Sequence, residues 1–129
     1  MQELRELAEG MSFNKLVGLK LIRRHRDGVT VQCTMRDELK NIAGVMHGGA
    51  LATLADAAVG IAIANHFEGR RPCTTTELKI NYLRPIARGK LTGRSRLVRV
   101  GKTLCVGWVD MFDSERKLAA VAIVTYMLL

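Results

Sequence analysis

Aromatic side chains are scarce in this sequence: its 129 residues include two Tyr, three Phe and one Trp. The strongly basic stretch 84–102 contains none of them, so it lacks the stacking surface that nucleic-acid bases use. A helix-turn-helix motif is absent as well. The net charge of +8 at pH 7 indicates an anionic partner, but these absences argue against a nucleic acid.

Cysteine is also rare, and the three that occur are far apart: Cys33, Cys73 and Cys105. An odd number without close spacing argues against a disulfide framework and against a zinc site, so we expect reduced, partly buried thiols. The histidines lack metal-ligand spacing, and no serine lies in a G-x-S-x-G elbow. A P-loop and a dinucleotide fingerprint are missing too. We therefore expect neither a metal nor a cofactor.

No apolar run reaches the roughly 20 residues that span a bilayer. The longest weakly polar run, 50–64, is interrupted by Thr53 and Asp56 and reads as a buried helix. The first eleven residues are amphipathic and charged, and they lack the apolar core and cleavage site of a signal peptide. We expect a cytoplasmic protein that does not bind a membrane.

The composition is that of one folded domain, with 48% hydrophobic and 25% charged residues. We predict a single domain over residues 1–129, in which residues 1–14 form a helical lead-in. Apolar periodicity predicts a helix over 2–10, a hairpin of strands 17–21 and 29–35, a long helix from about 49 to 66, and strands 74–83, 90–100, 103–112 and 118–129.

The predicted fold class is α+β, because the long helix is apolar on nearly every side and must be wrapped by other structure. An antiparallel sheet around this one central helix buries both elements. The alternation of apolar and polar residues along the strand is broken between Ser95 and Val98, which predicts a bulge or twist there.

Two glycines, Gly48 and Gly49, precede the long helix. They let the backbone approach a ligand closely, and the unpaired N–H groups of a helix start favour negative charge. This arrangement can form an oxyanion hole, although tight loops also use glycine pairs for steric reasons alone.

Asp56 is an acid inside an apolar helix, where it is too far from the start to be a cap and has no basic residue within one turn. Burial of a carboxylate without partners is unfavourable, which favours a functional role over a structural one. Asp56 lies eight residues beyond Gly48, about 10 to 12 Å along a helix. One carbonyl cannot contact both, so the spacing favours a site built from two antiparallel helices of a dimer.

The sequence resembles the hotdog-fold thioesterases, in particular the acyl-CoA thioesterases of the phenylacetic-acid-degradation type. The resemblance runs from about residue 15 to the C-terminus and rests on Asn41, Gly44, His47-Gly48-Gly49-Ala50, Leu54-Ala55-Asp56, "TTTELKINYLRP" and "VRVGKTL". It implies the hotdog fold and hydrolysis of an acyl-CoA thioester at a dimer interface, usually in a homotetramer of two such dimers.

The resemblance also implies roles for single residues. The Gly48 N–H would polarise the thioester carbonyl, with Asn41 and His47 beside it, and the partner chain's Asp56 would act as nucleophile or as general base on water. His47 and Asn41 have alternative roles in holding the loop through hydrogen bonds. Thr75, at the family position of a hydroxyl near the acid, would orient the water.

Strand alternation disagrees with this role for Thr75. Leu78 and Ile80 define the apolar face of the strand, which leaves Thr75 on the opposite face unless the start of the strand is distorted.

Seven basic residues and no acidic one lie between Arg84 and Lys102. Coenzyme A carries a pyrophosphate and a ribose phosphate, which Arg and Lys bind well. Arg84, Arg88 and Lys102, in or beside loops, are the candidates for phosphate contact, with Gly49 allowing close approach of the backbone. Two alternatives stay open: a non-catalytic acyl-CoA-binding hotdog module, and a hotdog dehydratase, whose histidine pattern differs from this one.

Overall fold

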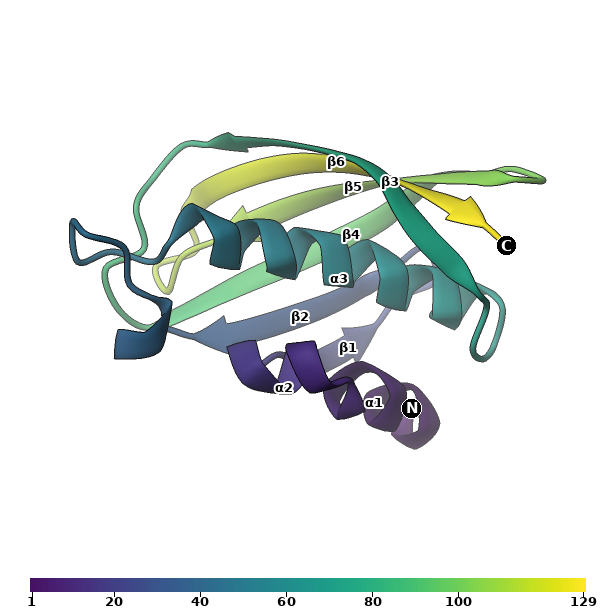
Figure 1. Cartoon of the computed structure of the whole chain (residues 1–129), viewed down its shortest axis with the longest axis horizontal. Coiled ribbons are helices and arrows are strands. Elements are labelled where there is room, and N and C mark those ends of the chain that lie inside the picture. Colours follow the sequence, from purple (N-terminus) through teal and green to yellow (C-terminus); the bar gives the residue numbers. More distant parts are fainter.

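The long helix α3 (Gly48–His66) lies across the concave face of a six-stranded antiparallel sheet (Figure 1). The structure is a computed structural model that describes all 129 residues. Its strands are β1 (Lys20–Arg24), β2 (Val29–Thr34), β3 (Cys73–Tyr82), β4 (Lys90–Val100), β5 (Leu104–Phe112) and β6 (Leu118–Leu128). They pair in the order β1-β2-β4-β5-β6-β3. The predicted sheet around one central helix is confirmed.

Small residues on both elements allow α3 to lie close to the sheet. A Cβ on Gly107 of β5 would come within 2.7 Å of the Val59 side chain, so only glycine fits there. The buried Ser95 hydroxyl of β4 donates a hydrogen bond to the Ala58 carbonyl, at 2.9 Å. By length and composition α3 resembles a membrane span, but it is the core helix, with 56% of its apolar window buried.

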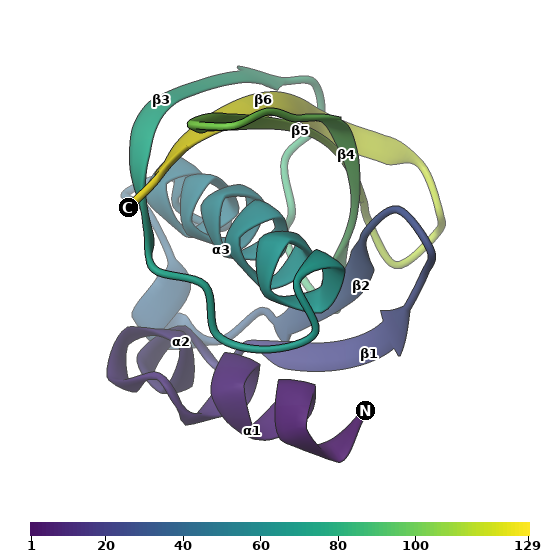
Figure 2. The ribbon, with the colours of Figure 1, turned by 90° about the vertical axis from the view of Figure 1, so that its right-hand side faces the viewer.

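Two short helices cover the open side of the sheet beside β1 (Figure 2). They are α1 (Gln2–Gly10), as predicted, and α2 (Ser12–Val17), which the sequence analysis missed. The predicted strand 17–21 was wrong in its first residues. Val17 ends α2, Gly18 turns the chain in the left-handed conformation at φ 77°, and β1 begins at Lys20. A short 3₁₀ helix, Asp37–Leu39, was also missed.

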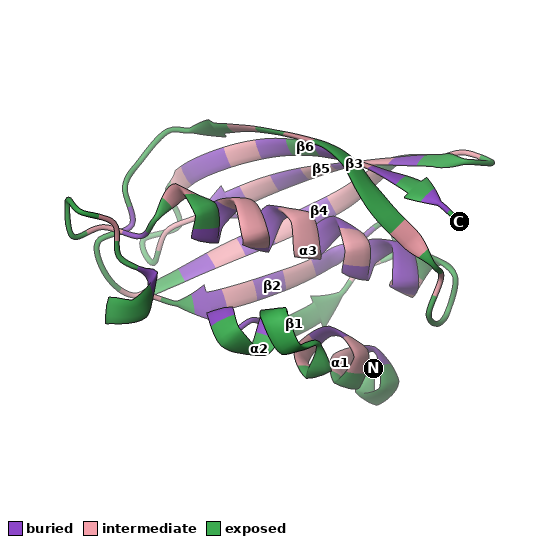
Figure 3. Cartoon of the chain, in the orientation of Figure 1, coloured by how far each residue is buried: buried purple, intermediate pink, exposed green.

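The strand β3 forms one edge of the sheet and is exposed along most of its length (Figure 3). Its pairing with β6 shifts between Thr75 and Glu77, so Thr76 is an extra residue in the strand. A second shift, between Leu97 and Arg99 of β4, confirms the bulge predicted near Val98.

Candidate active site

The loop before α3 is held by the side chains of Asn41 and His47. Asn41 Oδ1 accepts hydrogen bonds from the backbone N–H groups of Ala43 (2.9 Å) and Val45 (3.2 Å). His47 is the N-cap of α3, and its Nδ1 accepts the Gly49 N–H at 2.8 Å. Both residues therefore make the loop-stabilising contacts that the sequence left open as their alternative roles.

Gly48 keeps a free N–H at the start of α3, because no acceptor in the chain bonds to it. The Tyr82 hydroxyl donates to the Gly48 carbonyl oxygen at 2.8 Å and fixes the next peptide group, Gly48–Gly49. The N–H therefore stays available at the positive end of the helix dipole, where a ligand oxygen would be stabilised.

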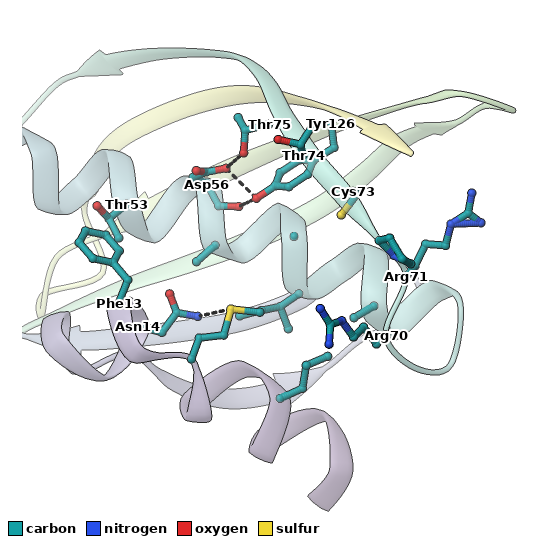
Figure 4. Close-up of a pocket in the computed structure, with 17 residues that line it drawn as sticks. Phe13, Asn14, Thr53, Asp56, Arg70, Arg71, Cys73, Thr74, Thr75 and Tyr126 are labelled. Atoms are coloured by element: carbon teal, nitrogen blue, oxygen red, sulfur yellow. Dashed lines mark hydrogen bonds between the residues drawn. The ribbon is translucent and has the colours of Figure 1, made fainter. Parts of the chain in front are cut away.

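The half-buried carboxylate of Asp56 accepts two hydrogen bonds (Figure 4). Thr75 Oγ1 donates to Asp56 Oδ1 at 2.8 Å, and Tyr126 Oη donates to the same oxygen at 2.7 Å. No protein group donates to the other oxygen, Oδ2. The apolar helix therefore holds an oriented carboxylate.

Thr75 reaches Asp56 because of the extra residue in β3. Beyond the shift at Thr76, the strand alternates as the sequence analysis assumed, with Leu78 and Ile80 partly buried against the core. At the shift the alternation reverses, and Thr75 is placed on the helix side. The parity argument against Thr75 fails at this distortion.

Tyr126 was missed by the sequence analysis. It lies on the buried face of β6, the same face as Val124. Burial raises the pKa of its hydroxyl well above the usual value. One signal was present: Gly60, one turn after Asp56, is a glycine inside a helix, which is typical of a close approach. A Cβ there would come within 2.8 Å of Tyr126 Oη.

Asp56, Thr75 and Tyr126 line a cavity of about 700 Å³ between α3, the N-terminal helices and the start of β3. One face of α3 forms its floor, through Thr53, Asp56, Ala57, Gly60, Ile61 and Ala64. Apolar side chains of the N-terminal helices, including Leu7 and Phe13, form the opposite wall. Arg70 and Arg71, which the sequence analysis did not consider, lie at one end (Figure 4).

A second cavity, of about 370 Å³, lies at the start of α3. Its lining includes Asn41, Gly48, Tyr82 and Arg84, but not Asp56. Asp56 and Gly48 therefore line different cavities of one chain.

Residues 43–120 match the family model of the thioesterase superfamily. The chain belongs to this superfamily. A protein of Saccharolobus solfataricus provisionally named an esterase is 30% identical over 115 residues, 89% of this chain and 81% of the relative. The medium/long-chain acyl-CoA thioesterase YigI of Escherichia coli K12 is 25% identical over 134 residues, 91% of this chain and 85% of YigI.

A solved structure gives the same fold. The PaaI protein from the phenylacetic acid degradation operon of Escherichia coli superposes with a TM-score of 0.89 at 22% identity, covering 99% of this chain and 91% of PaaI. The predicted hotdog fold and the predicted thioesterase family are confirmed, and the chain is a thioester hydrolase.

The basic residues chosen for coenzyme A lie at two ends of this thioesterase. Arg84 lines the cavity at the start of α3, and Arg88 follows in the same exposed loop. Lys102 lies beyond the far end of β4, an eleven-residue strand, so roughly 35 Å separates it from Arg88. Within one chain these residues cannot contact the same phosphate.

Proposed function

We propose that this thioesterase hydrolyses an aromatic or medium-chain acyl-CoA at a site shared by two subunits. Asp56 comes from one subunit and the Gly48 N–H from the other. Residues 1–129 act as one domain, which assembles as a homodimer and further as a homotetramer in the cytoplasm. The observation that carries the proposal is the oriented Asp56 carboxylate, which faces a cavity whose lining does not include Gly48 of the same chain.

The free Gly48 N–H activates the thioester carbonyl for attack. It donates to the thioester oxygen as negative charge develops there, with the dipole of α3 adding to the effect. Asn41 and His47 keep the loop in the conformation that presents this N–H, since their side-chain acceptors bond to neighbouring backbone groups. The site thus enters the reaction with its donor already oriented.

Asp56 supplies the reacting carboxylate. As a nucleophile it attacks the thioester carbon, the C–S bond breaks to release the coenzyme A thiolate, and water then hydrolyses the resulting anhydride. As a general base it removes a proton from a water that attacks the same carbon and releases the thiolate. In this arrangement Thr75 orients the Asp56 carboxylate and not the attacking water, because its hydroxyl donates directly to Asp56 Oδ1. Neither route needs a metal or a redox cofactor.

The exposed edge of β3 is where we place the dimer. Its outer side has no partner strand in the chain, and an exposed strand edge is a template for pairing with another chain. Antiparallel pairing of two β3 edges sets two α3 helices antiparallel, so that each Asp56 cavity faces the partner's helix start. A second apolar surface on the outer face of β5 and β6, with Leu104, Ile123 and Met127 exposed, supports assembly beyond the dimer.

Different parts of the substrate then occupy the two cavities. The coenzyme A phosphates bind at the end that carries Arg84 and Arg88, joined by Lys102 of the partner subunit, and Gly49 lets the backbone approach them closely. The acyl group fills the larger cavity along α3, which extends about 12 Å from Asp56 to Ala64. Such a length suits an aryl or medium-length alkyl group.

The proposal is tested by a free-thiol release assay on a panel of acyl-CoAs with the wild type and Asp56→Asn. We expect turnover of aromatic or medium-chain thioesters by the wild type and a loss of at least about 100-fold in kcat for the variant. Absence of turnover across the panel, or full activity of a correctly assembled variant, contradicts the proposal. Tight binding without turnover identifies a binding module instead.

A further inference from the structure

Both hydrogen bonds to the Asp56 carboxylate go to one of its two oxygens. We propose that Tyr126 is a positioning residue that, together with Thr75, occupies Asp56 Oδ1 and leaves Oδ2 as the oxygen that acts on the substrate. This inference rests on the proposed function and adds the identity of the reacting atom.

The geometry distinguishes the two oxygens. Oδ1 accepts from Thr75 Oγ1 at 2.8 Å and from Tyr126 Oη at 2.7 Å, whereas Oδ2 accepts from no protein group. A carboxylate oxygen has about two lone-pair positions, so two donors use the capacity of Oδ1. The remaining lone pairs that face the cavity are those of Oδ2.

Tyr126 is suited to this role because it stays protonated. The side chain is buried, and desolvation raises the pKa of its hydroxyl well above the usual value. A donor that does not ionise in the working pH range holds the carboxylate in one orientation throughout that range. Thr75 cannot ionise, so both donors have this property.

The hydroxyl of Tyr126 also lies 2.8 Å from the backbone carbonyl oxygen of Asp56. Its one proton goes to the carboxylate while that group is charged, because charge-assisted hydrogen bonds are the stronger ones. When Asp56 loses its charge, the proton has a second acceptor on the same residue. The tyrosine is thus kept in place through both states of the acid.

Gly60 makes room for the tyrosine. A Cβ at this position would lie 2.8 Å from Tyr126 Oη and 3.2 Å from its Cζ, closer than side chains normally approach. Glycine is unfavourable in a helix interior relative to alanine, so its presence here matches the space that the hydroxyl needs. Gly60 and Asp56 are four residues apart and share one face of α3.

The test compares Tyr126→Phe with Ser95→Ala, which also removes a buried hydroxyl bonded to α3 but leaves the carboxylate untouched. For Tyr126→Phe we expect a roughly 10-fold or larger fall in kcat with little change in KM. A loss confined to kcat marks a defect in the reacting carboxylate, whereas an interaction made equally with bound substrate and transition state would change KM.

The other titratable groups around the cavity are Cys73 on β3 and Arg70 and Arg71 in the preceding loop; the N-terminal helices contribute none. All three are unchanged in these variants. We expect Ser95→Ala to keep the wild-type kcat and KM even if it unfolds at lower temperature.

A second variant, Gly60→Ala, keeps the tyrosine and displaces its hydroxyl. We expect the same fall in kcat, while the helix itself gains propensity. The carbon-13 chemical shift of the Asp56 carboxyl at one fixed pH, with the signal identified by its loss in Asp56→Asn, should change in both variants and reports the lost hydrogen bond without substrate.

An unchanged Asp56 carboxyl chemical shift in both Tyr126→Phe and Gly60→Ala overturns the inference, and so does a kcat for Tyr126→Phe within about twofold of wild type. Either result leaves the thioesterase proposal standing if the wild type turns over acyl-CoA and Asp56→Asn does not. If no acyl-CoA is hydrolysed, the proposed function fails, and the Asp56 carboxyl chemical shift still decides whether Tyr126 holds the carboxylate.

Discussion

Thr75 donates one of the two hydrogen bonds that fix the Asp56 carboxylate, and its removal should slow the chemical step. A hydrogen bond to a charged group contributes about 1.5–3 kcal/mol, so Thr75→Val should lower kcat/KM by roughly 10- to 100-fold. Steady-state thiol release measures this effect. The control is Thr76→Val, since the Thr76 hydroxyl donates to the Thr125 carbonyl and not to the acid. Equal losses in both variants would contradict a specific role for Thr75.

The residues of the site differed in how far their sequence positions revealed them. Asp56 and Gly48 stood out because an acid in an apolar helix and a glycine at its start are locally unusual. The contact between Asp56 and Tyr126 joins residues 70 positions apart, so it depends on the register of β6 against α3. Local sequence patterns do not reveal that register, and Gly60 was the only residue that indicated a close approach to this part of α3.

At the scale of the element, the start of α3 depends on the cap that His47 provides. His47→Ala removes the acceptor of the Gly49 N–H and should lower the free energy of unfolding by about 0.5–2 kcal/mol. His47→Asn should retain stability, because asparagine is a favourable N-cap. Urea denaturation measures both. If His47 acts only through the cap, His47→Asn should also keep the wild-type kcat. A large loss of kcat in His47→Asn at normal stability would instead indicate that His47 contacts the substrate directly.

The oxyanion donor can be tested by removing a single N–H. Gly48 is the first residue of α3, where proline is favoured, and the preceding His47 has the extended conformation (ψ 137°) that proline requires. Gly48→Pro should lower kcat by about 100- to 1,000-fold, the usual cost of losing one such donor. Gly48→Ala adds the same Cβ beside the Tyr82 ring but keeps the N–H, and it should retain most activity. Similar losses in both variants would show that the effect is steric.

The elements themselves were largely predictable, because their apolar periods are long and unbroken. The predicted helix 49–66 corresponds to α3, and the strands from residue 74 onward fall within one or two residues of β3 to β6. The six-residue helix α2 was missed because it is shorter than two turns and its last residue, Val17, continues the alternation of the next strand. A distortion at the start of β3 was left open, and it could not be placed at Thr76 because three consecutive threonines do not alternate between apolar and polar residues.

At the scale of the whole molecule, the binding of the coenzyme A phosphates should depend on Arg84. Arg84→Gln should raise KM for acyl-CoA several-fold with kcat unchanged, and the effect should vanish with an acyl-pantetheine that lacks the phosphates. Lys117→Gln, an exposed lysine in the β5–β6 turn, is the matched control. An equal rise in KM for acyl-pantetheine would show that Arg84 does not bind phosphate.

The central claim is that one site takes Asp56 from one subunit and Gly48 from the other. Chains carrying Asp56→Asn and chains carrying Gly48→Pro, co-expressed with different tags and purified as mixed dimers, test it most directly. Each variant alone should be nearly inactive. A mixed dimer with shared sites has one intact site of two and should recover about half of the wild-type kcat per dimer. Mixed dimers no more active than either parent variant would contradict the shared site.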